Sequence, residues 1–203
     1  NALLTMGYVK KDEKSEKYSL TYKLLEVAGQ LLNHIDIRTI TQPHLANLAA
    51  QTGETVHLVQ REGVYIVYID KVEPTVNSIR MVSRIGMRQP LYCTAVGKAI
   101  LAELTDHDIL SVWEKSEIIP LTPNTMINRD IFMNEINRIR HIGYAIDHEE
   151  NELGVRCVAV AFRDYTGHAC HAISVSAPAS RMTDEKITDI SSLLIQARSE
   201  LER

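Results

Sequence analysis

Bulky and small side chains alternate along three stretches in the second half of the chain, covering residues 143–147, 155–162 and 172–177. This period of two is typical of β-strands, whose successive side chains point to opposite faces of a sheet. Burial of each bulky side chain would stabilise the fold by roughly 1.5–3 kcal/mol. We therefore predict a helical layer over the bulky face, which carries Tyr144, Ile146, Val158, Val160, Phe162, Ile173 and Val175.

The opposite face of these strands carries small side chains and a few hydrogen-bonding groups. Its members are Ala145, Asp147, Cys157, Ala159, Ala161, Ala172, Ser174 and Ser176. A solvent-exposed face is one interpretation, because polar strand faces commonly look outward. Exposed faces usually carry Lys, Glu and Thr, however, and this one has almost none. We favour a pocket floor, where small residues leave volume and Asp147, Ser174 and Ser176 orient a ligand.

Apolar residues recur at helical spacing through most of the remaining chain. The pattern predicts a helix over residues 22–33 and a second one from Asp36 to Gly53, which Pro43 would kink or divide. Thr94, Thr105 and Thr183 are candidate N-caps of later helices, because their hydroxyl groups can accept from free backbone N–H groups. A helix through residues 131–139 should close near Gly143.

Further strands are predicted at Glu54–Gln60 and Val64–Lys71, which form a hairpin, and at Ile79–Val82. Near the N-terminus, two short apolar pieces bracket the charged residues 10–17 and predict a small hairpin. The fold class is therefore α+β, with a mostly antiparallel sheet flanked by helices.

Residues 90–102 form the second stretch that suggests binding chemistry. Small residues follow Thr94, so a helix that begins there would present unencumbered N–H groups to an anion. Close packing of helix on sheet would need the same small residues, and that alternative stays open. Lys98 lies in the first turn, where its charge opposes the helix dipole. Pairing with an acid or with an anionic ligand would explain it.

Composition limits the possible functions. The 203 residues are 45% apolar and 24% charged, and no apolar run reaches the roughly 18 residues of a membrane span. We expect a cytoplasmic protein without a membrane partner. The net charge of −4 excludes a surface that coats nucleic acid as a whole, so any DNA contact would be local. The three cysteines, Cys93, Cys157 and Cys170, show no paired spacing and are expected to be free thiols.

Three other groups of residues contain side chains that could form a site. The stretch from His148 to Glu152 is interpreted as a solvated acidic turn. His168, Cys170 and His171 do not complete a tetrahedral zinc site, so neither a metal nor a cofactor is expected. A small-molecule enzyme that uses Cys93 or Cys157 with Asp147 is the alternative function.

Several motifs together identify a family. The most specific one comprises Gly143-Tyr144-Ala145, Asp147, Glu149-Glu150, Gly154 and Cys157, followed by Ser174, Ser176, Pro178 and Arg181. Others are Gly7-Tyr8-Val9 with Tyr18-Ser19-Leu20, Thr52-Gly53-Glu54-Thr55-Val56, and Pro90 to Ala102. On these residues the chain resembles the IclR family of bacterial transcriptional regulators over nearly its whole length.

The resemblance implies a division into domains. Residues 1–20 correspond to the C-terminal remnant of a winged helix-turn-helix DNA-binding domain, and most of that domain is expected to be absent. Residues 21–34 correspond to a linker helix, and residues 35–203 to a GAF-like effector-binding domain. The expected function is a ligand-responsive repressor of a carbon-catabolism operon, working on DNA as a homodimer or homotetramer.

The resemblance also implies a ligand site for a small keto acid or sugar acid. The backbone N–H groups of Ala95 and Val96 would meet the acid group. Asp147, Cys157, Ser174 and Ser176 match the family's side-chain contacts, and Ser176→Ala should barely affect stability if its hydroxyl contacts only the ligand. Ala161 stands where many relatives have proline, which could alter the pocket rim. Within the family, the chain looks closest to regulators of ketodeoxygluconate and related sugar-acid catabolism.

Overall fold

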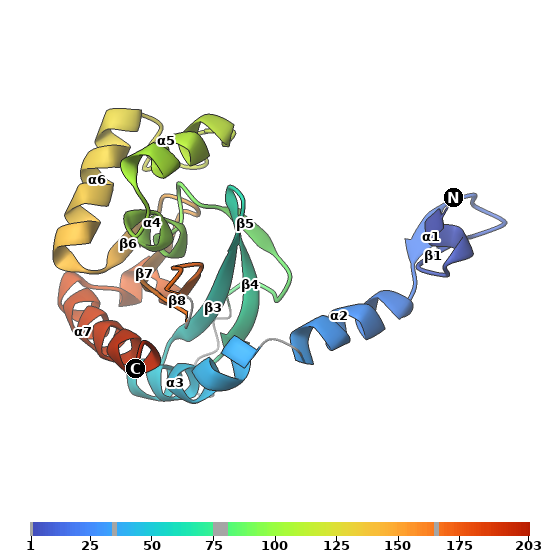
Figure 1. Ribbon diagram of the computed structural model, residues 1–203, viewed down its shortest axis with the longest axis horizontal. Helices are drawn as coiled ribbons and strands as arrows, with labels where there is room; N and C mark the ends of the chain where they lie inside the picture. The colour runs from blue at the N-terminus through green and yellow to red at the C-terminus, as the bar shows by residue number, and fades with distance from the viewer. Residues whose placement is uncertain (1, 34–35, 75–80, 165–166) are drawn as a thin grey trace. The chain divides into compact units, whose positions relative to one another are not determined.

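The computed structural model describes residues 2–33, 36–74, 81–164 and 167–203 (Figure 1). The chain divides into two compact units, Asn1–Thr39 and Ile40–Arg203.

The first unit contains the predicted N-terminal hairpin and the predicted long helix. Gly7, with φ of 74°, follows helix α1 (Ala2–Thr5), and strands β1 (Val9–Lys11) and β2 (Tyr18–Leu20) pair antiparallel. Helix α2 (Lys23–Asn33) follows. Its large apolar side chains Leu24, Leu25 and Val27 are exposed.

The second unit is built on one sheet of six strands in the order β5-β4-β3-β8-β7-β6. Every pair of neighbours is antiparallel, which confirms the predicted α+β class and sheet type. The strands are β3 (Thr55–Glu62), β4 (Tyr65–Val72), β5 (Arg88–Pro90), β6 (Ala145–His148), β7 (Val155–Phe162) and β8 (His171–Pro178).

The third strand of the first half lies elsewhere than predicted. Ile79 and the residue after it lie outside the described residues, whereas Met81 and Val82 are described and are not in a strand. The third strand is instead β5, which pairs with β4 from Tyr65 onward. Local β-propensity did not reveal it, because its residues are Arg88, Gln89 and Pro90.

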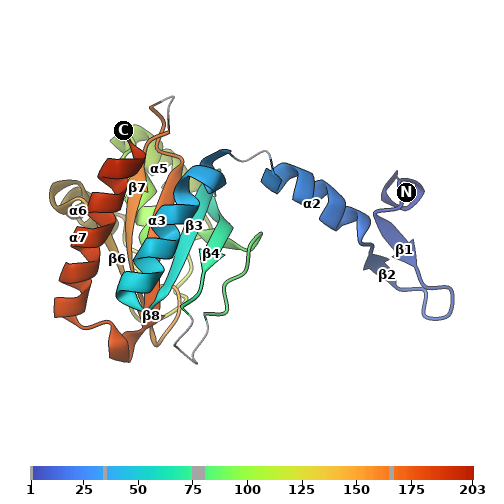
Figure 2. The same ribbon diagram turned by 90° about the horizontal axis from the view of Figure 1, so that it is seen from below.

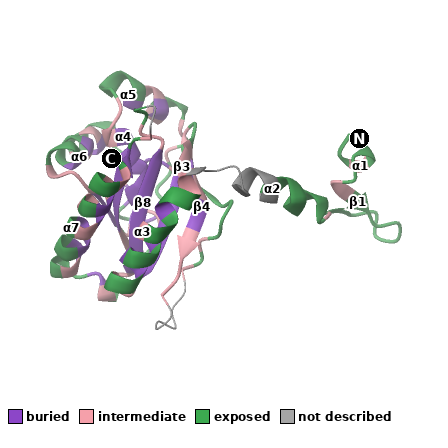
Figure 3. Ribbon diagram, turned by 60° about the horizontal axis from the view of Figure 1, so that its bottom comes forward, coloured by how far each residue is buried: buried purple, intermediate pink, exposed green. Residues whose placement is uncertain are grey.

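Two helices cover the bulky face of the sheet. Helix α7 (Asp184–Leu201) packs on β7 and β8, and Figures 2 and 3 show α3 (Asp36–Thr52) beside it over the same face. The predicted helical layer is therefore present, and the central strands are buried (Figure 3). Pro43 lies inside α3, which is one helix, so the alternative that proline divides it in two is wrong.

Helix α4 (Ala95–Ala102) covers part of the small-residue face, and α5 (Asp106–Lys115) and α6 (Arg129–Ile142) complete this side (Figure 1). The predicted caps Thr94, Thr105 and Thr183 each accept a hydrogen bond from the first turn of their helix. The α4 helix approaches closely because Gly97 lies against the backbone of Leu91, where a Cβ atom would collide. The alanines of the small face are buried beneath this helix, namely Ala145, Ala159, Ala161 and Ala172.

Candidate functional site

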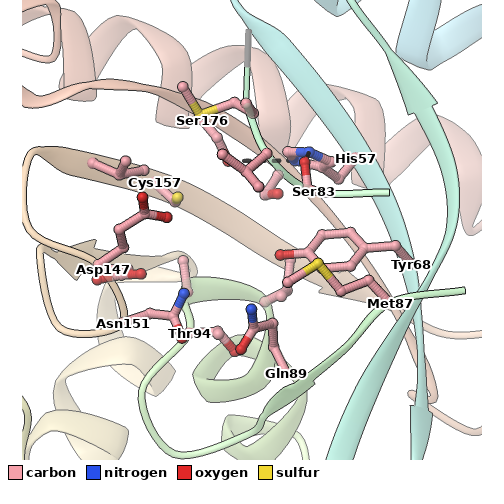
Figure 4. A pocket seen from close by; sticks show the side chains of 17 residues that line it. His57, Tyr68, Ser83, Met87, Gln89, Thr94, Asp147, Asn151, Cys157 and Ser176 are labelled. Atoms are coloured by element: carbon pink, nitrogen blue, oxygen red, sulfur yellow. Dashed lines mark hydrogen bonds between the residues drawn. The ribbon is translucent and has the colours of Figure 1, made fainter. Parts of the chain in front are cut away.

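The polar end of the small-residue face is not covered by α4 and opens into a cavity of about 140 Å³. The face thus has two parts: the alanines pack against a helix, and the polar residues line a pocket. The cavity's other walls are the start of α4 and the segment 81–89, and Figure 4 shows the polar groups that point into it. Its volume is close to that of an engineered cavity of about 150 Å³ that admits benzene.

Strand register explains how distant residues meet in this cavity. Ser176 on β8 is the partner of Cys157 on β7, and Cys157 is the partner of Asp147 on β6. Partners in a ladder point to the same face of a sheet, so these three side chains form one row across it. Ser174 lies one step along β8 on the same face. With Ala95 and Val96 of α4, all six predicted ligand contacts line one cavity.

The start of α4 offers backbone donors to this cavity. Thr94 has extended backbone angles (φ −113°, ψ 145°), and its Oγ1 accepts from the Gly97 N–H at 3.1 Å. Helix geometry leaves the N–H groups of the first turn without partners inside the helix. Thr94 caps only one of them. The N–H groups of Ala95 and Val96 are therefore suited to an acid group in the cavity.

Asp147 is the buried carboxyl group of the site. Its Oδ1 accepts from the Glu150 N–H at 2.7 Å. Burial first, and then the charge of Glu150, raise the pKa of Asp147 to about 7, although Lys98 acts in the opposite direction. A carboxyl group with this pKa is partly protonated at neutral pH, so it can donate a hydrogen bond to a ligand oxygen.

Lys98 and Glu150 form a buried ion pair next to Asp147, and neither of them lines the cavity. Their exposed fractions are 0% and 1%, and Lys98 Nζ lies 2.5 Å from Glu150 Oε1. The prediction that Lys98 pairs with an acid is confirmed. The interpretation of residues 148–152 as a solvated turn is wrong for Glu150, which is buried against Lys98. No periodicity in the sequence indicates this contact. Among the described residues, Glu150 Oε2 has no hydrogen-bond partner.

His57 on β3 also belongs to the site, and the sequence did not reveal it. Its exposed fraction is 2%; Nδ1 lies 3.3 Å from Ser176 Oγ, and Nε2 lies 2.7 Å from Ser83 Oγ. Burial and the charge of Lys71 lower the pKa of His57 to about 3, so the imidazole is neutral. Alternation along the predicted strand could have placed His57 on one face with Thr55. The pairing of β3 with β8, which brings it to Ser176, is a long-range contact.

This contact corrects one expectation about Ser176. Its hydroxyl group was expected to contact only the ligand, but in the structure it lies within hydrogen-bonding distance of His57. Ser176→Ala would therefore remove a buried partner of His57 as well as a ligand contact. A loss of stability is expected from this substitution, because unpaired buried polar groups are costly.

The alternative function of a cysteine enzyme receives no support from the thiols. Burial first, and then the charge of Asp147, raise the pKa of Cys93 to about 12. Burial likewise raises the pKa of Cys157. The reactive form of cysteine is the thiolate, which these environments disfavour. The structure also gives Cys93, Cys157 and Cys170 as free thiols, as predicted.

Ala161 does not lie at the rim of this cavity. It is buried under α4 and lines a different hollow, with Arg140 and Arg198. Replacement of the family's proline there cannot alter the rim directly. The described residues contain no helix long and apolar enough to span a bilayer, and no group of three or more potential metal ligands.

Comparisons with known proteins agree with this architecture. The family model described as "Bacterial transcriptional regulator IclR C-terminal" matches residues 29–203. The HTH-type transcriptional regulator KdgR of Escherichia coli K12 is 36% identical over 190 residues, which are 94% of this chain and 72% of KdgR. The DNA-binding transcriptional repressor YiaJ of the same organism is 39% identical over 182 residues, 89% of this chain and 64% of YiaJ. The crystal structure of the Thermotoga maritima IclR superposes with a TM-score of 0.86 at 40% identity, covering 100% of this chain and 81% of that one.

Proposed function

Because this chain belongs to the IclR family of bacterial transcriptional regulators, we propose that the cavity is its effector site and that the effector is a small organic acid. In this proposal residues 35–203 form the effector-binding domain. Residues 21–34 form the linker helix, and residues 1–20 form the end of a winged helix-turn-helix domain that contacts DNA. The protein acts in the cytoplasm, as a homodimer or homotetramer, on the DNA it regulates.

One observation carries the choice of an acid: the first turn of α4 opens into the same cavity as the row of Asp147, Cys157 and Ser176. The N–H groups of Ala95 and Val96 would hold the carboxylate, since a helix start favours negative charge. Ser174 and Ser176 would donate to further ligand oxygens. The volume of about 140 Å³ suits a small organic acid such as a keto acid, a hydroxy acid or a sugar acid.

Repression is the proposed direction of control, since YiaJ is described as a repressor. Such a regulator responds to an effector only if the effector binds two arrangements of the protein with unequal affinity. The coupling between two such sites is typically about 1–3 kcal/mol. We propose that α2 transmits this difference towards DNA, because in sequence it lies between residues 1–20 and α3, which continues into the second unit.

The test is a thermal-shift screen of pyruvate, glyoxylate, lactate, glycerate and gluconate, followed by calorimetric titration. A ligand at a hundred times its Kd should stabilise the protein by about 2.7 kcal/mol. Ala95→Pro should then abolish binding, because proline removes one N–H donor. The fold should tolerate it, since Ala95 is the first helical residue and Thr94 already has the extended backbone that precedes proline.

Arg129→Pro is the matched control. It places proline at the same first position of α6, after an extended Asn128, and Arg129 does not line the cavity. Binding should be unchanged in this variant. If none of the acids binds the unaltered protein, or if Ala95→Pro binds them normally, the proposed acid site is wrong.

A further inference from the structure

The cavity has an uneven distribution of charge. Asp147 and Glu152 are the charged side chains among its described lining residues, and both are acidic. None of the described lining residues is a lysine or an arginine. Of the lining residues that the structure describes, His57 alone could carry positive charge, but its pKa is lowered to about 3. Among the described lining residues, the group that attracts an anion is therefore the start of α4.

His57 and its partners lie across the cavity from that helix start. Figure 4 shows Thr94 on one side and the group of His57, Ser83 and Ser176 on the other. The Ser176 hydroxyl group is within hydrogen-bonding distance of His57 Nδ1, and the Ser83 hydroxyl group is within hydrogen-bonding distance of Nε2. Tyr68 packs edge-on against the imidazole, with ring centroids 5.0 Å apart. His57 and Ser176 are buried here, Ser83 and Tyr68 are half-buried, and none of these four side chains carries a charge.

The segment that carries Ser83 is itself held in place. Lys71 Nζ donates to the carbonyl oxygens of Met81 and Ser83, at 2.8 and 2.9 Å. The backbone of Tyr68 donates to Met87 and accepts from Gly86. Ser83 is thus fixed as a partner for His57. The imidazole, in turn, is fixed as a partner for Ser176.

A neutral imidazole between two hydroxyl groups allows Ser176 either to accept from a ligand hydroxyl group or to donate to a ligand carbonyl group. If a ligand hydroxyl donates to Ser176, Ser176 can donate to Nδ1, and Nε2–H then donates to Ser83. If a ligand carbonyl accepts from Ser176, Nδ1–H donates to Ser176, and Nε2 accepts from Ser83. Neither arrangement supplies a positive charge. A second carboxylate at this end would be desolvated with no lysine or arginine among the described lining residues to pair with it, and the nearby Lys71 is already paired with Glu73 at 2.8 Å; this is strongly unfavourable.

We infer that His57 is a specificity-determining residue: with Ser83 and Ser176 it selects acids that carry one carboxylate and an uncharged, oxygen-bearing far end, and it excludes dianions. This inference rests on the proposed acid site and adds the class of acid. Sugar acids and hydroxy acids with a terminal hydroxyl group fit this description. Dicarboxylates and phosphorylated acids do not.

Three acids with the same three-carbon skeleton test the inference. Lactate ends in a methyl group, glycerate in a hydroxymethyl group, and tartronate in a second carboxylate. By calorimetry, the unaltered protein should bind glycerate at least about ten-fold more tightly than tartronate, and several-fold more tightly than lactate. Gluconate and glucarate repeat the contrast between hydroxymethyl and carboxylate on a longer chain.

His57→Phe keeps a ring but removes both nitrogens. It should reduce the preference for glycerate over lactate to within about two-fold, while lactate affinity changes little. His57→Asn keeps an amide that can face Ser176 and should restore part of the preference. His171→Phe is the control, because His171 is buried in the same sheet and does not line the cavity. If His57→Phe does not fold, Ser83→Ala at a half-buried position should lower the preference several-fold.

The outcomes separate the two proposals. If acids bind but tartronate binds as tightly as glycerate, the proposed role of His57 is wrong and the acid site stands. The same conclusion follows if His57→Phe and Ser83→Ala keep the full preference for glycerate over lactate. If no acid of either series binds the unaltered protein, the acid site fails, and this inference fails with it.

Discussion

At the residue scale, the chemistry of the site depends on how buried charges are distributed. Lys98 neutralises Glu150 by direct contact, and Glu150 in turn donates its backbone N–H to Asp147. Within the described part of the chain no cation contacts Asp147 in this way, so burial dominates and the pKa of Asp147 rises to about 7. An acid ligand therefore meets a carboxyl group whose charge changes close to neutral pH.

We predict that affinity for a monocarboxylate such as pyruvate falls by about ten-fold between pH 6 and pH 8, because only about a tenth of Asp147 stays protonated one unit above its pKa. Ionised Asp147 would repel the ligand and could no longer donate to it. Calorimetric titration across this range measures the effect. Asp147→Asn, which cannot ionise, should flatten the profile, and an unchanged profile in that variant would assign the titration to another group.

The raised pKa of Asp147 also makes the stability of the folded protein depend on pH. In the unfolded chain Asp147 has its ordinary pKa of 3.8, so between about pH 4 and pH 7 the folded protein keeps a proton that the unfolded chain has released. Stability from this group is complete below about pH 4 and is lost as pH rises through about 7. Asp147→Asn should therefore gain stability relative to the unaltered protein over that range.

At the element scale, local patterns in the sequence predicted most of the helices and strands. Thr94 and Gly143 mark the start of α4 and the end of α6, where Gly143 has a φ of 82°. These signals act between neighbours in sequence, so they can be recognised without the fold. The alternation along β7 and β8 correctly separated a helix-covered face from a face that contains a pocket.

Long-range contacts limited what could be predicted. The register of β3 against β8 brings His57 to Ser176, and no local pattern specifies that pairing. The burial of Glu150 depends on Lys98, which is 52 positions away in sequence. β5 forms through its pairing with β4, although its own residues have little β-propensity. The six expected site residues came from family motifs and the strand pattern, and all of them line the cavity, whereas the positions of His57 and Ser83 beside them emerged only from the fold.

Helix α4 is the element on which the site depends most, and its closeness to the sheet rests on Gly97. We predict that Gly97→Ala destabilises the protein by at least about 3 kcal/mol, because the added Cβ would overlap the backbone of Leu91, which cannot rotate away. Urea unfolding measures the change. Intrinsic helix propensity alone would instead favour alanine by about 0.5–1 kcal/mol, so an equally or more stable variant would contradict the close approach.

Gly154→Ala serves as the comparison for this substitution. Gly154 has a φ of 82° but nothing within 4 Å of the added Cβ, so only backbone strain is expected. That strain costs about 1–2 kcal/mol. A larger loss at Gly97 than at Gly154 would separate steric overlap from backbone conformation.

At the scale of the whole molecule, the surface of the first unit differs from that of the second. On α2 and just before it, Tyr22 is 88% exposed, Leu25 66% and Val27 46%. Large apolar side chains gathered on one short helix are typical of a protein–protein contact. Regulators that read two-fold symmetric DNA also require paired subunits. Both arguments favour a homodimer or homotetramer in which α2 takes part.

We predict that Leu25→Lys lowers the oligomeric state, because a lysine charge would have to be desolvated in an apolar contact between subunits. Sedimentation velocity at micromolar concentration should show a dimer or tetramer for the unaltered protein and a smaller species for this variant.

Ile131→Lys is the control: Ile131 lies on α6 and is 58% exposed, and its replacement should leave the assembly unchanged. Acid binding should survive in Leu25→Lys, since residues 95–96 and 147–176 supply the proposed contacts from within the second unit. A monomeric unaltered protein, or an unchanged assembly in Leu25→Lys, would show that the exposed face of α2 has another role.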